Sequence, residues 1–325
     1  RPSGDDLRPM LLALAPSMCG IALQVPKTLP LNNGRCCGGL PTADGRVVAD
    51  GLLLRSATPA DASIEDVEHL RTCLSLRTVI DLRTPEEAMR DCGLRLLYEE
   101  GPGAAPAVHY VPIVVETQLR AGIKRKALMR PRYLLPMALH GLSSKVSPLP
   151  QLRARAKHSL EIAAIGLLDS STLDEIYLWL LMGYGEEIRR VIETVSTPGS
   201  LPCLLHCTHG KDRTGLAVAM CLHVCGVPVA HIARDYALSG DYGCTVEGRA
   251  AMEQMLPPHL VGRVNIDRWC EAPEEVLLRL FDHVERRWGS INAYLDSIGV
   301  DAALRARCRD ALTVPADETH CAYAA

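Results

Sequence analysis

The chain has 325 residues, 48% of them hydrophobic, which is enough to bury a large core. No break in composition divides it, so we expect a single domain over residues 1–325. Its formal net charge of −3 excludes bulk electrostatic attraction to nucleic acid or to a membrane, so any such partner must be recognised by a local patch.

An N-terminal arm, residues 1–31, contains an apolar run from Met10 to Val25 behind Arg8. This run resembles the hydrophobic part of a signal peptide, but Pro16 and Gln24 interrupt it and it is too short to span a bilayer. We expect a packing arm or an amphipathic helix.

Strands and helices are expected to alternate along the chain, as a mostly parallel sheet flanked by helices requires. The expected strands are Val47–Arg55, Arg77–Leu82, Val108–Val115 and Leu201–Leu205. The expected helices are Ser63–Cys73 behind a cap at Asp61 or Ser63, Leu173–Thr194 with a break at Gly183 or Gly185, one starting over Gly215–Leu222, Ile232–Ser239, Val246–Leu256, and two near Pro273–Arg287 and Ser290–Ile298. The fold class is therefore α/β.

A helical insertion is expected over residues 119–170. From Leu119 to Leu160 it holds ten lysines and arginines and no acidic residue. Two interpretations stay open, a lid or surface facing an anionic membrane, and a solvated helical elaboration. Nucleic-acid binding is disfavoured, because few aromatic residues lie among the charges and no nucleic-acid motif is present.

The segment 201–222 predicts a strand, a loop and a helix around Cys207 and Arg213, which are separated by five residues. In such a loop, successive backbone N–H groups and the start of the following helix form an anion site. The same field favours a nucleophilic thiolate at Cys207. Arg213 can bind two phosphoryl oxygens, and Thr214 can donate to the sulfur. The predicted phosphate-binding residues are Thr208, His209, Gly210, Lys211, Asp212 and Arg213.

Glycines at two positions are expected to shape this loop, Gly210 through a positive φ and Gly215 through close packing. Metal binding by the cluster of Cys203, His206, Cys207 and His209 is disfavoured, because strand alternation points Cys203 and His206 to opposite faces. We expect neither a metal nor a cofactor, since the loop itself supplies positive charge.

The stretch from His206 to Gly215, HCxxGKxRTG, resembles the signature of the cysteine-dependent protein tyrosine phosphatase superfamily. Its GKDRTG form is similar to the bacterial-type tyrosine and lipid phosphatases, which also occur in fungi and kinetoplastids. Four further segments resemble that group: Asn32–Pro59, Val79–Glu87, Ile232–Ser239 and Trp288–Leu295. One departure is plain, because Arg35-Cys36-Cys37 stands where the family usually has Phe-Arg-Asp before Gly-Gly, and the role of that acidic residue is not carried over.

The resemblance implies a protein tyrosine phosphatase-like fold and hydrolysis of phosphomonoesters through a phosphocysteine intermediate. In that family the aspartate of GKDRTG, here Asp212, is a proposed general acid, and a lysine at the position of Lys211 accompanies activity on phosphoinositides as well as phosphotyrosine. Asp81 competes as the acid because it ends a strand facing the same site, or else it fixes Arg213 or the loop. Asp235 is expected to be structural.

A rival function is a catalytically silent module that binds phosphorylated partners through the same loop. The intact Cys207, Arg213 and Thr214 argue against it. Thirteen cysteines without regular spacing, beside a motif that needs a free thiolate, favour a reducing compartment, and we expect the cytoplasm. A side hypothesis makes Cys36 or Cys37 a redox partner of Cys207.

Overall fold

The computed structural model describes residues 28–89, 91, 94–101, 103–128, 170–255, 261–262 and 265–316. The apolar run expected in the N-terminal arm and most of the expected basic insertion, residues 129–169, lie outside these ranges.

A five-stranded sheet lies at the centre, with strand order β1-β3-β6-β4-β5. Its strands are β1 (Arg35–Cys36), β3 (Leu53–Ser56), β4 (Thr78–Asp81), β5 (Ala107–Tyr110) and β6 (Cys203–His206). Strands β3, β6, β4 and β5 run parallel, and only the edge strand β1 is antiparallel. Strands β4 and β6 are buried at every residue, and their central residues are apolar, as in a sheet covered on both faces. The predicted α/β class with a mostly parallel sheet is confirmed.

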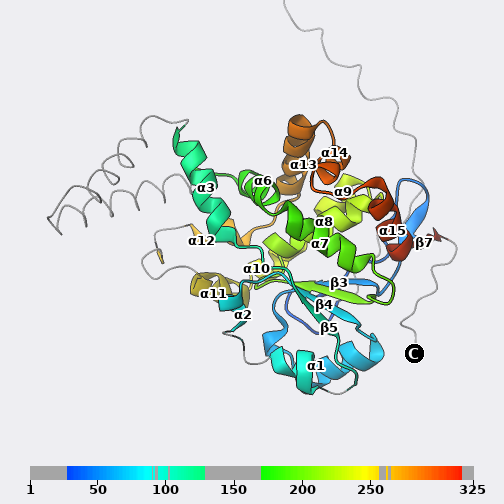
Figure 1. Cartoon of the computed structure of the whole chain (residues 1–325). Coiled ribbons are helices and arrows are strands. Elements are labelled where there is room, and N and C mark those ends of the chain that lie inside the picture. Colours follow the sequence, from blue (N-terminus) through cyan, green and yellow to red (C-terminus); the bar gives the residue numbers. More distant parts are fainter. Residues whose placement is uncertain are drawn as a thin grey trace, which may run out of the picture.

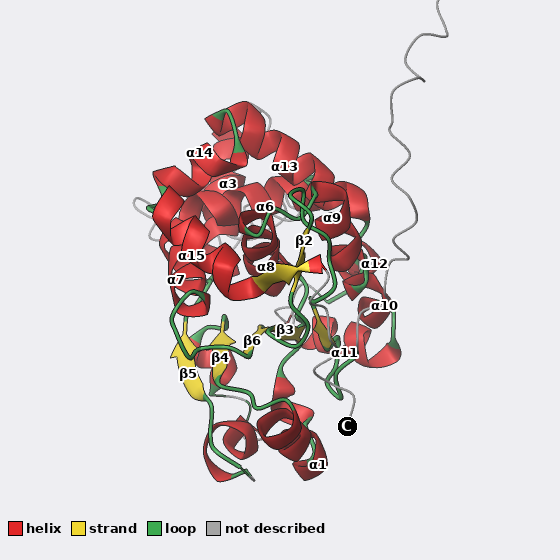
Figure 2. Cartoon of the chain, turned by 90° about the vertical axis from the view of Figure 1, so that its right-hand side faces the viewer, coloured by secondary structure: helices red, strands yellow, loops and turns green. Residues whose placement is uncertain are grey.

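Two unequal layers of helices cover the sheet (Figure 1). The larger layer holds α6 (Leu173–Gly183), α7 (Gly185–Val195), α8 (Asp212–Val224), α9 (Val229–Ala237), α13 (Glu274–Trp288), α14 (Ile291–Ser297) and α15 (Ala302–Leu312). The smaller layer holds α1 (Ile64–Glu68) and two π-helical turns, η2 (His69–Cys73) and η3 (Leu96–Glu100). Figure 2 shows both layers with the sheet between them.

The remaining described helices are α2 (Pro85–Ala88), α3 (Val115–Leu128), α10 (Ser239–Gly243), α11 (Val246–Met255) and α12 (Ile266–Cys270), with a 3-10 turn at Pro59–Asp61. Among them, α3 packs against α6 and α10 against α9. In the part of the chain that the structure describes, no helix combines the length and apolar character needed to cross a membrane.

Local sequence signals predict several helix boundaries correctly. Ser63 caps α1 through a reciprocal capping box with Asp66, as the cap prediction requires. The long helix predicted over Leu173–Thr194 is interrupted as expected, because α6 ends at Gly183 and α7 begins at Gly185.

The prediction of one strand over Val47–Arg55 is wrong. The segment forms two strands in different sheets, because the chain turns at Gly51, whose φ is +76°. Strand β2 (Arg46–Val48) pairs antiparallel with β7 (Thr313–Pro315), a C-terminal strand that the sequence analysis did not predict. The strand predicted over Val108–Val115 is also shorter, since α3 begins at Val115.

Candidate active site

The predicted loop lies at the carboxyl edge of the sheet. Strand β6 ends at His206, which is in register with Ser56 of β3 and Asp81 of β4, and α8 begins at Asp212. Residues 207–211 therefore connect a central strand to the positive end of a buried helix, where an anion is stabilised.

The loop curls around the Cys207 sulfur. The backbone N–H of Gly210 donates to Cys207 Sγ at 3.2 Å, and Cys207 is only 2% exposed. The Thr214 hydroxyl, expected to donate to the sulfur, is buried and has no hydrogen-bond partner among the described residues. The predicted hydrogen bond from Thr214 to the sulfur is therefore not present in the structure.

Glycine is required at position 210. Its φ is +65°, as predicted, and a Cβ there would lie 2.3 Å from the carbonyl oxygen of Ser56. The expected close packing of Gly215 is also present, since a Cβ there would lie 3.0 Å from the ring of Tyr236.

Two side chains from residues 32–59 bind backbone carbonyls of the loop. Asn33 Nδ2 donates to the His209 carbonyl at 2.9 Å, and Arg55 Nη2 donates to the Gly210 carbonyl at 2.8 Å. Two loop carbonyls are therefore held by donors from another part of the chain. Sequence reasoning missed both contacts, which span 176 and 155 residues.

Asp235 of α9 stabilises this support. Its carboxylate accepts from Arg35 Nε at 2.9 Å and Arg55 Nη1 at 2.5 Å, and its side chain is 4% exposed. Arg35 is itself bonded to Asn33 through Nη1 at 2.7 Å. Asp235 therefore binds two buried arginines that support the loop, which agrees with the structural role expected from the sequence.

Asp235→Asn is expected to lower the free energy of unfolding by about 3–5 kcal/mol, because two buried guanidinium groups would lose their counter-charge. Urea unfolding measures this change in the free energy of unfolding. The matched control is Asp282→Asn, which removes an exposed partner of Arg286 and should cost about 1 kcal/mol or less. Equal effects of the two substitutions would contradict the assigned role.

Arg213 is fixed by Glu87, the functional contact that the sequence analysis did not assign. Arg213 Nη1 and Nη2 donate to the two Glu87 oxygens at 2.6 and 2.7 Å, and the Thr208 hydroxyl donates to Glu87 Oε1 at 2.9 Å. Glu87 is the N3 residue of α2 and forms a capping box with Thr84. That Thr84-to-Glu87 spacing was the available signal, but it indicates a helix start and not a partner 126 residues away.

The Glu87 carboxylate is held ionised. Burial raises its pKa, but the hydrogen bonds and charge of Arg213 lower it by more, to about 2. The pair therefore stabilises the folded state above pH 4.5, and this contribution is lost as the pH falls through about 2.

Glu87→Gln is expected to lower the free energy of unfolding by on the order of 3 kcal/mol at pH 7, from about 1.36 kcal/mol per pKa unit. The difference from the unsubstituted chain should shrink as the pH falls below 4.5. Urea unfolding at a series of pH values measures it, with the exposed neighbour Glu86→Gln as control. A pH-independent difference would rule out the ion pair as its cause.

Asp81 lies on the other face of the sheet from Cys207. Along β4 and β6, Asp81 and His206 alternate onto the smaller helical layer, and Cys207 belongs to the core of the larger one. Asp81 is fully buried and binds Arg83 Nη2 at 2.7 Å, and its carboxylate is 3.7 Å from His206 Nε2. Its carboxylate therefore contacts Arg83, Tyr98 and His206. These contacts include neither Arg213 nor the loop, which the alternative prediction had Asp81 fixing.

His206, the last residue of β6, and His209, in the loop, are neutral at pH 7. Burial lowers the pKa of both His206 and His209 to about 4. His206 Nε2 is hydrogen-bonded to the Tyr98 hydroxyl of η3 at 2.8 Å, which orients it away from the sulfur.

Lys211 does not point freely into the loop. Its ammonium donates to the backbone carbonyls of Trp269 and, at 3.1 Å, Glu271, and it lies 3.5 Å from Asp212 Oδ1. Asp212, the first residue of α8, keeps 27% of its side chain exposed and accepts a 2.5 Å hydrogen bond from Tyr177.

Only the first residues of the expected basic insertion are described. In α3, Lys126 forms an ion pair with Glu175, with 2.6 Å between Lys126 Nζ and Glu175 Oε2. Lys124 and Arg125 are exposed. The predicted basic residues from Arg130 to Lys157 lie outside the described ranges.

The side hypothesis that makes Cys36 or Cys37 a redox partner of Cys207 does not fit, because neither is close enough for a disulfide. Cys36 is in register with Leu54, itself level with Leu204, so Cys36 lies two strands across and three residues back from Cys207. That separation is on the order of 14 Å between Cα atoms, about twice what a disulfide allows. Cys37, whose N–H donates to the Leu53 carbonyl, lies one residue farther back than Cys36. The Cys36 sulfur instead accepts from the amides of Gly38 and Gly51.

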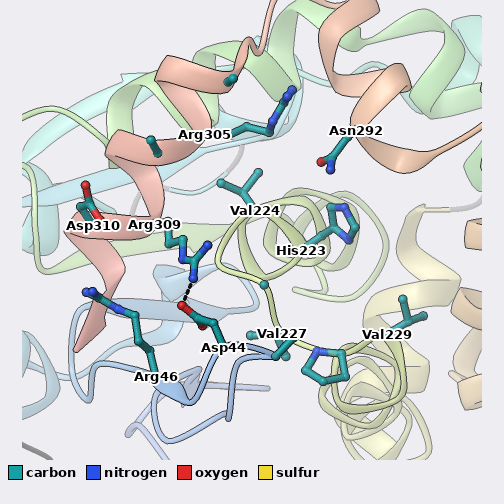
Figure 3. A pocket seen from close by; sticks show the side chains of 15 residues that line it. Asp44, Arg46, His223, Val224, Val227, Val229, Asn292, Arg305, Arg309 and Asp310 are labelled. Carbon is teal, nitrogen blue, oxygen red and sulfur yellow. Dashed lines mark hydrogen bonds and ion pairs between the residues drawn. The ribbon is translucent and has the colours of Figure 1, made fainter. Parts of the chain in front are cut away.

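A groove of about 750 Å³ lies at the other end of α8 (Figure 3). It is about 20 Å from the Cys207 loop, the length of a 13-residue helix. Two of its three arginines pair with acids: Arg309 pairs with Asp44, as the dashed line in Figure 3 marks, and Arg305 pairs with Asp296. The third, Arg46, donates to the hydroxyl and the carbonyl of Thr313. The groove is separate from the Cys207 site, because the length of α8 lies between them.

Comparison with known proteins gives matches over the same region. Residues 27–314 match the family model described as the tyrosine phosphatase family. A Cupriavidus necator protein with the provisional name tyrosine-protein phosphatase is 27% identical over 274 residues, 84% of each chain. A Nostoc commune protein named tyrosine-protein phosphatase is 28% identical over 135 residues, 40% of this chain and 45% of that one. The family match includes every strand of the main sheet and the whole loop around Cys207.

Proposed function

The chain belongs to the tyrosine phosphatase family, and from that membership we propose that it hydrolyses phosphomonoesters through a phosphocysteine at Cys207. The observation that carries this proposal is the closure of the loop on the sulfur, with the Gly210 amide donating to it and Arg213 held by Glu87. Such a loop combines a nucleophile with preorganised donors for phosphoryl oxygens.

In the first step the Cys207 thiolate attacks phosphorus in line with the leaving oxygen. The sulfur–phosphorus bond forms as the phosphorus–oxygen bond breaks, and Asp212 gives its proton to the leaving oxygen. Arg213 and the loop amides bind the equatorial oxygens, on which charge accumulates in the transition state.

In the second step water attacks phosphorus and Asp212 takes a proton from it. The sulfur–phosphorus bond breaks, which releases inorganic phosphate and restores the thiolate. Asp212 is the better acid of the two aspartates, because Asp81 is fully buried on the far face of the sheet and Asp212 is partly exposed at the loop.

Phosphotyrosine and phosphoinositides are the proposed substrates. The position of Lys211 favours phosphotyrosine, because its charge is directed at backbone carbonyls and not at a second phosphate. Contact of the basic insertion with an anionic membrane remains a separate proposal. The ten free cysteines of the described ranges, among them Cys207, support our proposal of a reducing, cytoplasmic location.

Phosphate release by the reduced protein tests this function, measured on a phosphotyrosine peptide and on soluble mono- and bis-phosphorylated phosphoinositides. We expect Cys207-dependent release, faster from the peptide. Faster release from the phosphoinositides would assign a lipid substrate class. Tight binding of both substrates without release would instead identify the chain as a phosphate-binding module.

A further inference from the structure

Two buried tyrosines form a hydrogen-bonded chain that ends at Asp212. Tyr177 of α6 donates to Asp212 Oδ1 at 2.5 Å, and its oxygen lies 2.7 Å from the hydroxyl of Tyr236 on α9. Each tyrosine is 1% exposed, and their rings meet edge to face with centroids 6.0 Å apart. Neither tyrosine belongs to the catalytic loop.

The direction of this chain follows from the chemistry of its members. An ionised carboxylate only accepts hydrogen bonds, so the Tyr177 proton is committed to Asp212. The Tyr177 oxygen must then accept from Tyr236. Burial and the Asp212 charge raise the pKa of both tyrosines, so both remain proton donors across the working pH range.

Titratable and charged groups face Asp212 from several sides, and His209 among them is neutral at pH 7. Lys211 is 3.5 Å away, and His209 and Arg213 are its neighbours in the loop and in α8. Burial raises the pKa of Asp212, but Lys211 and then the Tyr177 hydrogen bond lower it by more, so it lies below its ordinary value. Tyr177 is the group among these that also fixes the direction of the carboxylate, since its own ring is held in the core.

We infer that Tyr177, supported by Tyr236, is a positioning residue that orients the Asp212 carboxyl for proton transfer and favours its ionised form. This inference rests on the proposed role of Asp212 as the general acid. Tyr177 itself acts through Asp212 and is not expected to touch the substrate.

Tyr177→Phe tests the inference through the pH dependence of kcat on a poor leaving group such as an alkyl phosphate. A general acid works while protonated, so the rate falls as the pH rises through its pKa. Loss of the hydrogen bond to the carboxylate raises that pKa, so we expect the alkaline limb to move up by about one pH unit. We expect kcat on an aryl ester with a good leaving group to change less than about threefold, because that reaction needs little acid assistance.

Tyr294→Phe is the matched control. The Tyr294 hydroxyl is equally buried and donates to the Leu181 carbonyl of the same helix α6 at 2.9 Å, without contact to Asp212. It should lose similar stability and keep the alkaline limb in place. Tyr236→Phe provides a second variant, expected to move the limb in the same direction by less, and circular dichroism verifies that each variant is folded.

Asp212→Asn distinguishes a failure of the proposed mechanism from a failure of the positioning role of Tyr177. If the alkaline limb survives in Asp212→Asn, Asp212 is not the acid and the proposed mechanism fails at that step. If Asp212→Asn abolishes the limb while Tyr177→Phe and Tyr236→Phe leave it in place, the mechanism stands and the positioning role of Tyr177 is refuted.

Discussion

Cys207→Ser is expected to reduce phosphate release by more than about 10⁴-fold and to leave phosphate binding nearly unchanged. A serine hydroxyl is far less ionised than a cysteine thiol, so the nucleophile is lost. The groups that hold the anion, the Gly210 amide and Arg213, stay in place because the exchange of sulfur for oxygen removes little volume. Release from a phosphotyrosine peptide and titration calorimetry with the same peptide measure the two quantities.

Cys73→Ser is the matched control, because Cys73 is an exposed free cysteine outside the loop. It should retain the rate of the unsubstituted protein. Residual turnover of Cys207→Ser within tenfold of that rate would show that a different group attacks phosphorus.

Arg213→Lys is expected to lower kcat/KM by about 10³-fold, a value typical of the loss of preorganised charge at a transition state. An ammonium cannot hold two phosphoryl oxygens at once, and it cannot reproduce the paired hydrogen bonds of Arg213 to both Glu87 oxygens. The larger part of the loss should appear in kcat, since the charge on the equatorial oxygens grows in the transition state.

The control for this substitution is Arg286→Lys, which changes an exposed arginine paired with Asp282 on α13. Its kinetics should match those of the unsubstituted protein. If Arg213→Lys raised KM alone and kept kcat, Arg213 would bind the ground state and the transition state equally, and its assigned role would be wrong.

The parts of the fold that could be predicted are those with local signals. The buried strand β6 and the helix α8 follow from short apolar runs that flank the loop, and Ser63 indicates the start of α1. The division of Val47–Arg55 between two sheets could not be predicted, because β2 finds its partner in β7, more than 260 residues later.

The candidate site also has a part that local sequence predicts and a part that it does not. Cys207, Gly210 and Arg213 are close in sequence, so their spacing alone indicates a phosphate loop. Asn33, Glu87 and Tyr177 contact His209, Arg213 and Asp212 from other elements. Their residue types do not predict these contacts, because the partners are 35 to 176 residues away in the sequence. The position of Asp81 was predictable in principle, because it alternates in phase with Val79 and opposite to Ile80.

The measurement that tests the central claim most directly is to stop turnover of a phosphotyrosine peptide in acid and locate phosphate on the protein by peptide mass spectrometry. Our account predicts one phosphoryl group per chain, on the peptide that contains Cys207, and none in Cys207→Ser. Phosphate bound to another residue, or turnover with no covalent phosphoprotein at any time point, would contradict it.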